Sequence, residues 1–196
     1  MTINILGVGA SLRKQSNSTA ALKITLDLAK KYGAQIRLLN LRETKLPLYK
    51  TENGSGETEI HKVEEDVNWA DAFILASPDY HGSMSGSMKN FLDYFWTEFA
   101  GKLFGYICSS HEKGLTVMDH MRTAVRQCYG WSMPYGISIQ GGEDFDVNGK
   151  IANDELSQRL EMLARDLVVY GELVRTQFTR DLRNNLNETF ASRYRK

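Results

Sequence analysis

The chain lacks the features that mark disulfide-bonded, secreted and membrane-spanning proteins. Its 196 residues include two cysteines, Cys108 and Cys128, which are too few for a disulfide framework. No apolar run approaches the length that a membrane-spanning helix needs. At the N-terminus the basic residues follow the apolar stretch, which is the reverse of a signal peptide. We therefore expect a cytoplasmic protein with reduced thiols and no membrane partner.

The chain also lacks an excess of either charge. Its 24 Lys and Arg residues balance 24 Asp and Glu residues, so the formal net charge is zero. A neutral protein has no overall field that collects nucleic acid, and we expect no nucleic-acid partner. The four histidines include no pair at the helical spacing that metal sites use, so we expect no metal.

Short apolar runs alternate with helical patterns along the chain. Three of the runs are apolar at nearly every position, which is typical of strands that are buried on both faces. The expected strands are residues 3–9, 34–41, 72–77, 103–110 and 135–140, and the expected helices are residues 18–32, 57–69, 86–99, 115–128 and 153–173. This order predicts an α/β fold, a flavodoxin-like doubly wound parallel sheet of five strands in the order 2-1-3-4-5 with helices on both faces. A ligand then binds beyond the carboxyl ends of the first and third strands, where the strand order reverses.

We expect one domain over residues 1–174, followed by a polar tail over residues 175–196. Two interpretations of the tail stay open, a partly frayed end or an arm that lies on a second subunit. The large apolar residues of the helix expected at 86–99 are Met88, Phe91, Leu92, Phe95, Trp96 and Phe99. They form more apolar surface than one face of a sheet needs, which predicts a homo-oligomer, a dimer or a tetramer, with this helix at the contact.

A loop rich in hydroxyl groups, "GVGASLRKQSNSTAAL", follows the first strand. Its hydroxyl-bearing and cationic residues include Ser11, Arg13, Ser16, Ser18 and Thr19. Together with the free N–H groups of the helix that follows, they favour a phosphate site over simple capping, which needs only one of them. Leu12 stands where a dinucleotide fingerprint has its third glycine, and the Gly-Lys-Ser/Thr end of a Walker loop is absent. The loop therefore predicts a phosphate monoester.

A second loop, "SPDYHGSMSG", follows the third strand and faces the first loop by the rule of strand order. Pro78 sets a sharp exit from the strand, Tyr80 offers an aromatic ring, and Gly82 and Gly86 allow close approach of the backbone or positive φ. These features suit a planar heterocycle with hydrogen-bond acceptors along its edge. Met84 stands where a nucleophile elbow has serine, which excludes the hydrolase interpretation.

A third loop, "SSHEKG" at 109–114, follows the fourth strand and flanks the same crevice. Cys108 precedes it, and we expect this cysteine to fill the core rather than act as a nucleophile. His111 is a candidate base, although its charged neighbours Glu112 and Lys113 indicate a solvated loop.

These segments, with "LPLY" at 46–49, resemble the NADPH-dependent FMN reductase family over roughly residues 3–172. That family typically reads Gly-x-Ser-x-Arg-x-x-Ser in the first loop. Its second loop reads Pro-Glu-Tyr-Asn-Gly-Ser-x-Pro-Gly, followed by Leu-Lys-Asn-x-x-Asp-Trp. This chain has Asp79 in place of the Glu, His81 in place of the Asn and Ser85 in place of the Pro, and its third loop lacks a double glycine often seen there.

The resemblance implies FMN as the cofactor and assigns three groups of binding residues. By position, Ser11, Arg13, Ser16 and Ser18 inherit contact with the FMN phosphate. Contact with the isoalloxazine ring, largely through the backbone, is inherited by Pro78, Asp79, Tyr80, His81, Gly82 and Ser83. Contact with the other side of the ring is inherited by Ser109, Ser110 and His111.

The resemblance also implies an oxidoreductase in which flavin carries the chemistry, so that no catalytic side chain is expected. NADPH or NADH is the co-substrate, and the acceptor is a small molecule such as a flavin, quinone, nitroaromatic, azo dye or metal oxyanion. Two alternatives stay open, a flavodoxin-like electron carrier and an FMN-binding protein without turnover. Carriers are usually strongly acidic, and the zero net charge of this chain argues against that alternative.

Overall fold

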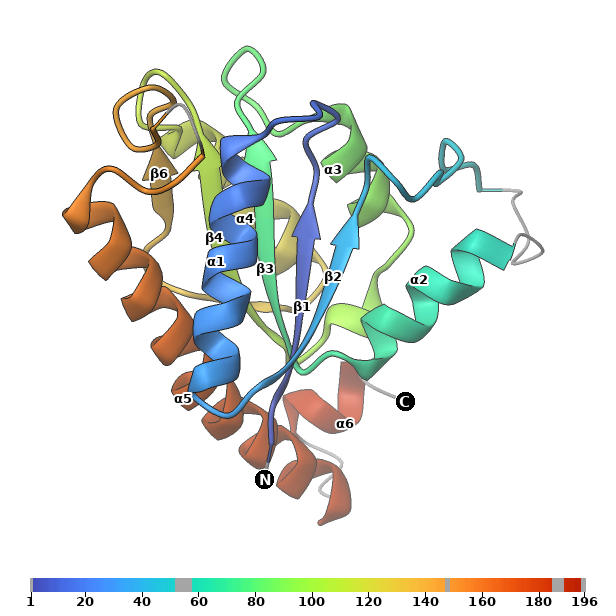
Figure 1. Ribbon diagram of the computed structural model, residues 1–196. Helices are drawn as coiled ribbons and strands as arrows, with labels where there is room; N and C mark the ends of the chain where they lie inside the picture. Colours follow the sequence, from blue (N-terminus) through green and yellow to red (C-terminus); the bar gives the residue numbers. More distant parts are fainter. Residues whose placement is uncertain (1, 52–57, 147–148, 185–188, 195–196) are drawn as a thin grey trace.

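The computed structural model describes residues 2–51, 58–146, 149–184 and 189–194 (Figure 1). Its parallel sheet is formed by β1 (Asn4–Gly9), β2 (Gln35–Asn40), β3 (Ala72–Pro78), β4 (Leu103–Ser109), β5 (Trp131–Ser132) and β6 (Ile137–Ile139). The strand order is β2-β1-β3-β4, and both β5 and β6 pair with β4. The predicted fold class and strand order are therefore confirmed, with the fifth strand divided into two short pieces.

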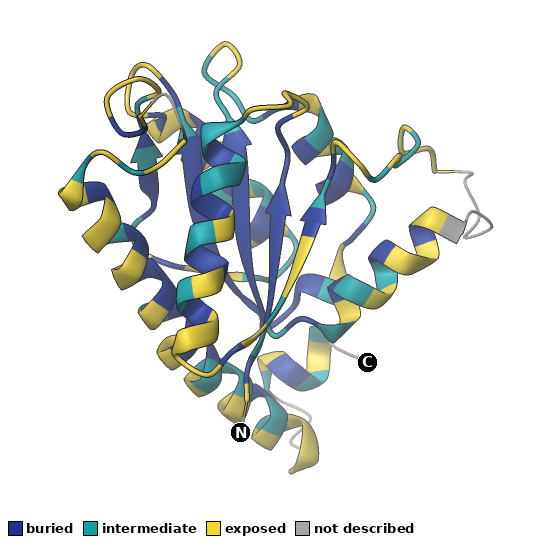
Figure 2. Ribbon diagram, in the orientation of Figure 1, coloured by how far each residue is buried: buried dark blue, intermediate teal, exposed yellow. Residues whose placement is uncertain are grey.

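Helices cover both faces of the sheet. They are α1 (Asn17–Lys31), α2 (Thr58–Trp69), α3 (Gly86–Asp93), α4 (Leu115–Gln127), α5 (Asp154–Arg183) and α6 (Phe190–Tyr194). Buried side chains of α1 and α5 form one apolar core with the sheet, and those of α2, α3 and α4 form a second core on the opposite face. The apolar runs lack alternation because β1, β3 and β4 face a core on each side, as Figure 2 shows.

The helix predicted at 86–99 is shorter than expected. Helix α3 ends at Asp93, and a separate 3-10 turn spans Thr97–Phe99. Phe91, Phe95 and Phe99 are all buried and pack against one another, with ring centroids of neighbouring pairs 5.3 and 5.6 Å apart. The expected excess of apolar surface is therefore wrong for most of this segment, although Trp96 remains 63% exposed.

The helix predicted to end at 173 continues to Arg183 as α5. After α5, helix α6 packs against the body of the domain, where the ring of Tyr194 stacks on the ring of Tyr129 with centroids 3.9 Å apart. Phe190 of α6 also contacts the rings of Tyr129 and Trp131. The described part of the predicted tail is therefore helical and packs on its own chain.

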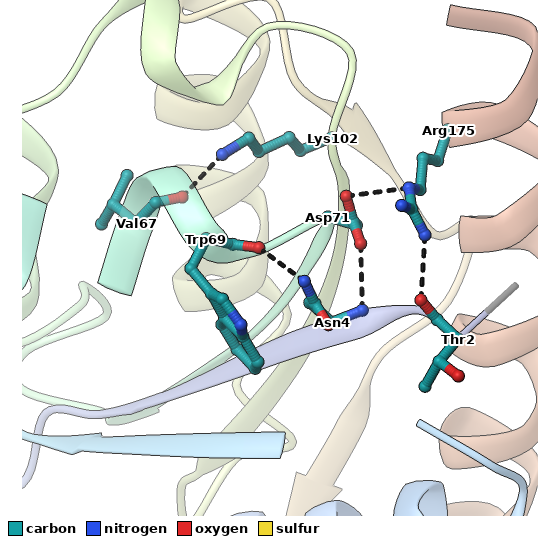
Figure 3. Close-up of polar contacts among 7 residues, drawn as sticks. All are labelled: Thr2, Asn4, Val67, Trp69, Asp71, Lys102 and Arg175. Atoms are coloured by element: carbon teal, nitrogen blue, oxygen red, sulfur yellow. Dashed lines mark hydrogen bonds and ion pairs between the residues drawn. The ribbon is translucent and has the colours of Figure 1, made fainter. Parts of the chain in front are cut away.

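A polar network joins the elements at the amino ends of the strands (Figure 3). The carboxylate of Asp71 accepts a hydrogen bond from the backbone N of Asn4 at 3.0 Å and pairs with Arg175 of α5 at 3.2 Å. Arg175 also donates to the carbonyl of Thr2, and buried Lys102 donates to a carbonyl in the last turn of α2. The network therefore holds the sheet at the end opposite its carboxyl ends (Figure 1).

The loops that follow the carboxyl ends of the strands contain many exposed residues (Figure 2). Gly9 of β1 pairs with Ala76 of β3, so the loops that follow these two strands start side by side. Within the described residues, no helix is long and apolar enough to cross a membrane.

Candidate functional site

A cleft of about 710 Å³ lies at the carboxyl ends of β1, β3 and β4. This is the place where the strand order reverses, as the sequence predicts. The predicted site residues that line it are Ser11, Arg13, Ser16, Ser18, Pro78, Asp79, Tyr80, His81, Gly82, Ser109, Ser110 and His111. Its volume lies within the usual range for small-molecule sites.

The first loop presents hydroxyls and backbone N–H groups at the start of α1. Ser16 is the N-cap, and its hydroxyl accepts a hydrogen bond from the backbone N of Thr19 at 3.3 Å. Its Oγ also lies 3.1 Å from that of Ser18, while Ser11 is buried and accepts from the backbone N of Arg13. The first turn carries no acidic residue, so nothing in it opposes an anion at the positive end of the helix.

Two serines at the start of α3 hold the first loop in place. The hydroxyls of Ser85 and Ser87 both donate to the carbonyl of Ala10, at 3.1 and 2.6 Å. Ser85 is also the N-cap of α3 and accepts from the backbone N of Met88. The serine that departs from the family pattern at position 85 therefore caps a helix and joins the two loops.

The second loop contains a two-residue turn with a specific backbone. Tyr80 and Ser83 exchange backbone hydrogen bonds at 3.0 and 3.2 Å around the turn. The two central residues both have positive φ, 57° at His81 and 76° at Gly82. This is the pattern of a type I′ turn, which favours Asn-Gly because asparagine and glycine tolerate the left-handed region. Histidine is among the other residues enriched there, which explains how His81 replaces the family asparagine.

Asp79 connects the second loop to the third. Its Oδ1 accepts from the backbone N of Gly82 at 2.8 Å, and its Oδ2 accepts from the hydroxyl of Ser110 at 2.7 Å. The backbone N of Asp79 donates to the carbonyl of Ser109 at 2.9 Å. One carboxylate therefore fixes the turn and holds the two walls of the cleft together.

Ser83 and Gly86 of the second loop do not line the cleft. The hydroxyl of Ser83 points to α4 and lies 3.0 Å from Nδ1 of His120, and its predicted contact with a ring, largely through the backbone, stays a prediction. Gly86 does not have positive φ and has open space around its α-carbon, since it simply begins α3.

The third loop turns sharply into α4. Lys113 and Gly114 have φ values of 64° and 56°, and a side chain at Gly114 would collide with the sulfur of Cys108. Cys108 is fully buried, and burial, with a smaller contribution from Asp79, raises the pKa of its thiol to about 12. The thiol therefore stays protonated near neutral pH, which agrees with the prediction that Cys108 fills the core.

Several residues of the cleft were not predicted from the sequence. Gln15 lies in the first loop, Asn17 begins α1, Thr116 lies in the first turn of α4, and Gly141 follows β6. Gly141 approaches Asn17 so closely that a β-carbon there would lie 2.7 Å from the amide nitrogen of Asn17. The glycine pair directly after the last expected strand could have indicated this part of the cleft, because that strand ends at the same edge of the sheet as the strands before the other three loops.

A second cavity of about 520 Å³ adjoins the cleft and shares part of the first loop as a wall. Arg42, which follows β2, lines it together with Lys23 of α1. Arg42 does not line the cleft itself. The residue lies next to the first loop because β2 pairs with β1, so both strands end at the same edge.

Comparisons with known proteins agree with this arrangement. The NADPH-dependent FMN reductase family matches residues 3–144. An NAD(P)H-dependent FMN reductase of Pseudomonas aeruginosa is 32% identical over 185 residues, which cover 88% of this chain and 97% of that protein. An NADPH azoreductase of a Bacillus species is 30% identical over 115 residues, and the match covers 54% of this chain and 65% of that protein.

Among solved structures, the flavoenzyme NAD(P)H:(acceptor) oxidoreductase FerB from Paracoccus denitrificans superposes with a TM-score of 0.75. The match covers 88% of this chain and 98% of that structure, at 18% identity. At this identity the likeness establishes the fold, and the residues of the cleft carry the argument about function.

Proposed function

Since the chain belongs to the NADPH-dependent FMN reductase family, we propose that it is an FMN-dependent oxidoreductase that uses NAD(P)H to reduce a small-molecule acceptor. The family match confirms the resemblance predicted from the two loops, with FMN as the cofactor and NAD(P)H as the co-substrate. When bound, FMN supplies the hydride and electron-transfer chemistry, and the protein supplies position and polarity.

The first loop suits the phosphate of FMN. Ser11, Ser16 and Ser18 offer hydroxyls within one short segment, and Arg13 offers a cation beside the start of α1. A phosphate there accepts hydrogen bonds from the serines and from the free N–H groups of the first helical turn. The loop has one such anion site and no second glycine-rich turn, which favours a monoester such as FMN over the pyrophosphate of FAD.

The second and third loops suit the two sides of a flat ring. His81 and Gly82 of the turn line the cleft from the second loop, and Ser110 with its neighbours lines it from the third loop. Tyr80 is 41% exposed at the edge of the cleft, where its ring can cover part of the flavin or of an incoming substrate. Asp79 fixes the spacing between the walls through its two hydrogen bonds.

The observation that carries the proposal is the convergence of a phosphate loop and a positive-φ turn on one cleft. Steady-state oxidation of NADPH by purified protein, with a quinone or free FMN as acceptor, tests the activity. Arg13→Ala should weaken FMN binding about tenfold or more, since a charge-assisted hydrogen bond contributes about 1.5–3 kcal/mol. Arg126→Ala is the matched control, because Arg126 is an exposed arginine at the end of α4 outside the cleft.

The same measurement separates this proposal from the alternatives. A flavodoxin-like carrier or a non-catalytic FMN-binding protein binds flavin but does not consume NADPH in the presence of a small acceptor. Binding of FMN without turnover, under conditions where an established flavin reductase is active, would refute the enzymatic proposal.

We also propose a homodimer or tetramer in the cytoplasm. Trp96 is 63% exposed, and Leu48, which is 74% exposed, lies in a segment that binds α3 through Asn90. Large apolar side chains that are exposed to solvent favour association. Sedimentation at micromolar concentration tests this proposal, and a monomer of 22.2 kDa would contradict it.

A further inference from the structure

A buried carboxylate outside the cleft has no part in the proposed function. Asp144 is 7% exposed and ends the turn of residues 140–144, which follows β6. It does not line the cleft, and in the described part of the chain it has no ion pair. A buried carboxylate is costly unless its oxygens are hydrogen-bonded, so the partners of Asp144 indicate what it holds in place.

The carboxylate of Asp144 fastens the 140–144 turn to the start of α5. Its Oδ2 accepts a hydrogen bond from the backbone N of Gln140, and its Oδ1 accepts one from the side-chain amide of Asn153, both at 2.7 Å. Asn153 is the N-cap of α5, so it is itself held by the backbone N–H groups of the first helical turn. The backbone N of Ala152 also donates to the carbonyl of Asp144 at 2.9 Å. The turn is therefore anchored to a rigid element.

The 140–144 turn packs against the first residue of α1. Gly141 lines the cleft, and a β-carbon at this position would lie 2.7 Å from the amide nitrogen of Asn17. The φ of Gly141 is not positive, so this close approach, rather than the backbone conformation, favours glycine here. Asn17 also lines the cleft, which means that the turn limits where its side chain can lie.

The turn has a second contact, with the third loop. The side-chain amide of Gln140 donates to the carbonyl of His111 at 3.1 Å. Asp144 therefore has two routes to the cleft, one through Gly141 to Asn17 and one through Gln140 to the third loop. The second route is an exposed hydrogen bond, which water can replace at little cost, so the contact with Asn17 is the stronger candidate.

We propose that Asp144 is a positioning residue for the phosphate end of the flavin, because it holds the 140–144 turn against Asn17 beside the first loop. The proposal rests on the proposed function. Asn17 lies between Ser16 and Ser18, whose hydroxyls are 3.1 Å apart, and a side-chain amide there can donate to a phosphate oxygen. Riboflavin has the ring of FMN without the phosphate. We therefore expect Asp144 to increase the affinity for FMN and to leave the affinity for riboflavin unchanged.

Flavin selectivity gives the first experiment. Apoprotein is titrated with FMN and with riboflavin, and the ratio of the two dissociation constants measures the contribution of the phosphate. In Asp144→Ala we expect FMN affinity to fall roughly tenfold and riboflavin affinity to stay within about twofold, the effect of losing about one hydrogen bond to a charged group. Asp144→Asn should keep most of the wild-type ratio, because its amide oxygen still accepts from the backbone N of Gln140.

Asp71→Ala is the matched control for general destabilisation. Asp71 also accepts a hydrogen bond from a backbone N, that of Asn4, but it lies at the opposite end of the strands and does not line the cleft (Figure 3). We expect this variant to lower the melting temperature and to keep the wild-type ratio of FMN to riboflavin affinity.

A double-mutant cycle tests the route from Asp144 to the flavin. Asn17→Ala should lower FMN affinity by itself, and adding Asp144→Ala should cause little further loss, since both changes act through one contact. Gly141→Ala should lower the preference for FMN over riboflavin, because its β-carbon displaces the amide of Asn17. If Asp144→Ala does not fold, Asp144→Asn and Gly141→Ala provide the same comparison.

Three outcomes would overturn the assignment. Equal losses of FMN and riboflavin affinity in Asp144→Ala would place its effect on the third loop or on the whole fold. Unchanged FMN affinity in folded Asp144→Ala would show that the turn positions nothing at the site. Additive losses in the double mutant would exclude the route through Asn17. If the wild-type protein prefers FMN to riboflavin but does not oxidise NADPH, the proposed reaction fails and the same titrations still decide the role of Asp144. If it binds neither flavin, both proposals fail.

Discussion

Replacing Asp79 by alanine tests whether the second and third loops act as one binding unit. The carboxylate is the only group that the structure shows bonded to both Gly82 of the turn and the hydroxyl of Ser110, within the described residues. Alanine removes both hydrogen bonds and leaves the backbone path of the strand unchanged. The turn then loses a side-chain contact that supports its positive-φ conformation, and the two loops keep only the backbone bond from residue 79 to Ser109.

The size of the effect follows from these two bonds. A hydrogen bond to a charged group contributes about 1.5–3 kcal/mol, and the half-buried position of Asp79 favours the lower end of that range. The two bonds together then contribute roughly 3 kcal/mol to holding the loops in place. If flavin binding must restore part of this order, FMN affinity should fall roughly ten- to hundredfold, at about 1.4 kcal/mol for each factor of ten.

The assay is a titration of apoprotein with FMN, followed by the quenching of flavin fluorescence. Asp79→Asn is the conservative variant, because its amide oxygen can still accept from Gly82 and its NH₂ can donate to Ser110. It should lose less affinity than the alanine variant. Asp66→Ala is the matched control, since Asp66 is also half-buried and accepts a hydrogen bond at 2.8 Å, from Arg37, remote from the cleft.

One result would refute the reasoning directly. If Asp79→Ala binds FMN as tightly as the wild type while its melting temperature is also unchanged, the carboxylate does not organise the cleft. A loss of affinity in Asp66→Ala equal to that in Asp79→Ala would instead assign the effect to general destabilisation.

Three further predictions concern the turn, the flavin and the thiols. Gly82→Val should lose FMN affinity and stability, because a β-branched residue is strained at positive φ. His81→Asn should keep FMN affinity within a few-fold and should keep most NADPH oxidation. A His81→Asn protein that binds FMN but does not turn over would contradict this prediction. Apoprotein should bind FMN more tightly than FAD in a fluorescence titration, and the reverse order would exclude the monoester site. In native protein at mildly alkaline pH, a thiol reagent should modify half-buried Cys128 before Cys108, because the thiol of Cys108 stays protonated below its raised pKa of about 12. Equal rates of modification of the remaining thiol in the two single Cys→Ser variants would disprove the burial argument.

Local patterns in the sequence determined the order of elements and the chemistry of the main loops. Apolar runs predicted β1, β3 and β4 because strands buried on both faces need apolar residues at every position. The hydroxyls and the arginine of the first loop lie within a few residues of one another, so their position together at the start of α1 follows from their spacing in the sequence. Strand order could be predicted because right-handed crossovers allow few arrangements.

Boundaries that depend on packing were not visible in the sequence. The apolar spacing of residues 86–99 continues past the end of α3, because Phe95 and Phe99 reach the same core from a 3-10 turn. The polar residues after 173 gave no sign that α5 continues, since that part of the helix is held by contacts such as Phe178 against the backbone at Gly101.

Only the tertiary structure decided which distant residues surround the site. Asp79 accepts a hydrogen bond from Ser110, which lies 31 residues further along the sequence. Gly141, which follows the last strand, approaches Asn17 at the start of α1. Arg42 lies beside the first loop because β2 pairs with β1 in a register that brings their carboxyl ends to one edge. No local pattern encodes such contacts, since each depends on the pairing and twist of the whole sheet rather than on the residues on either side.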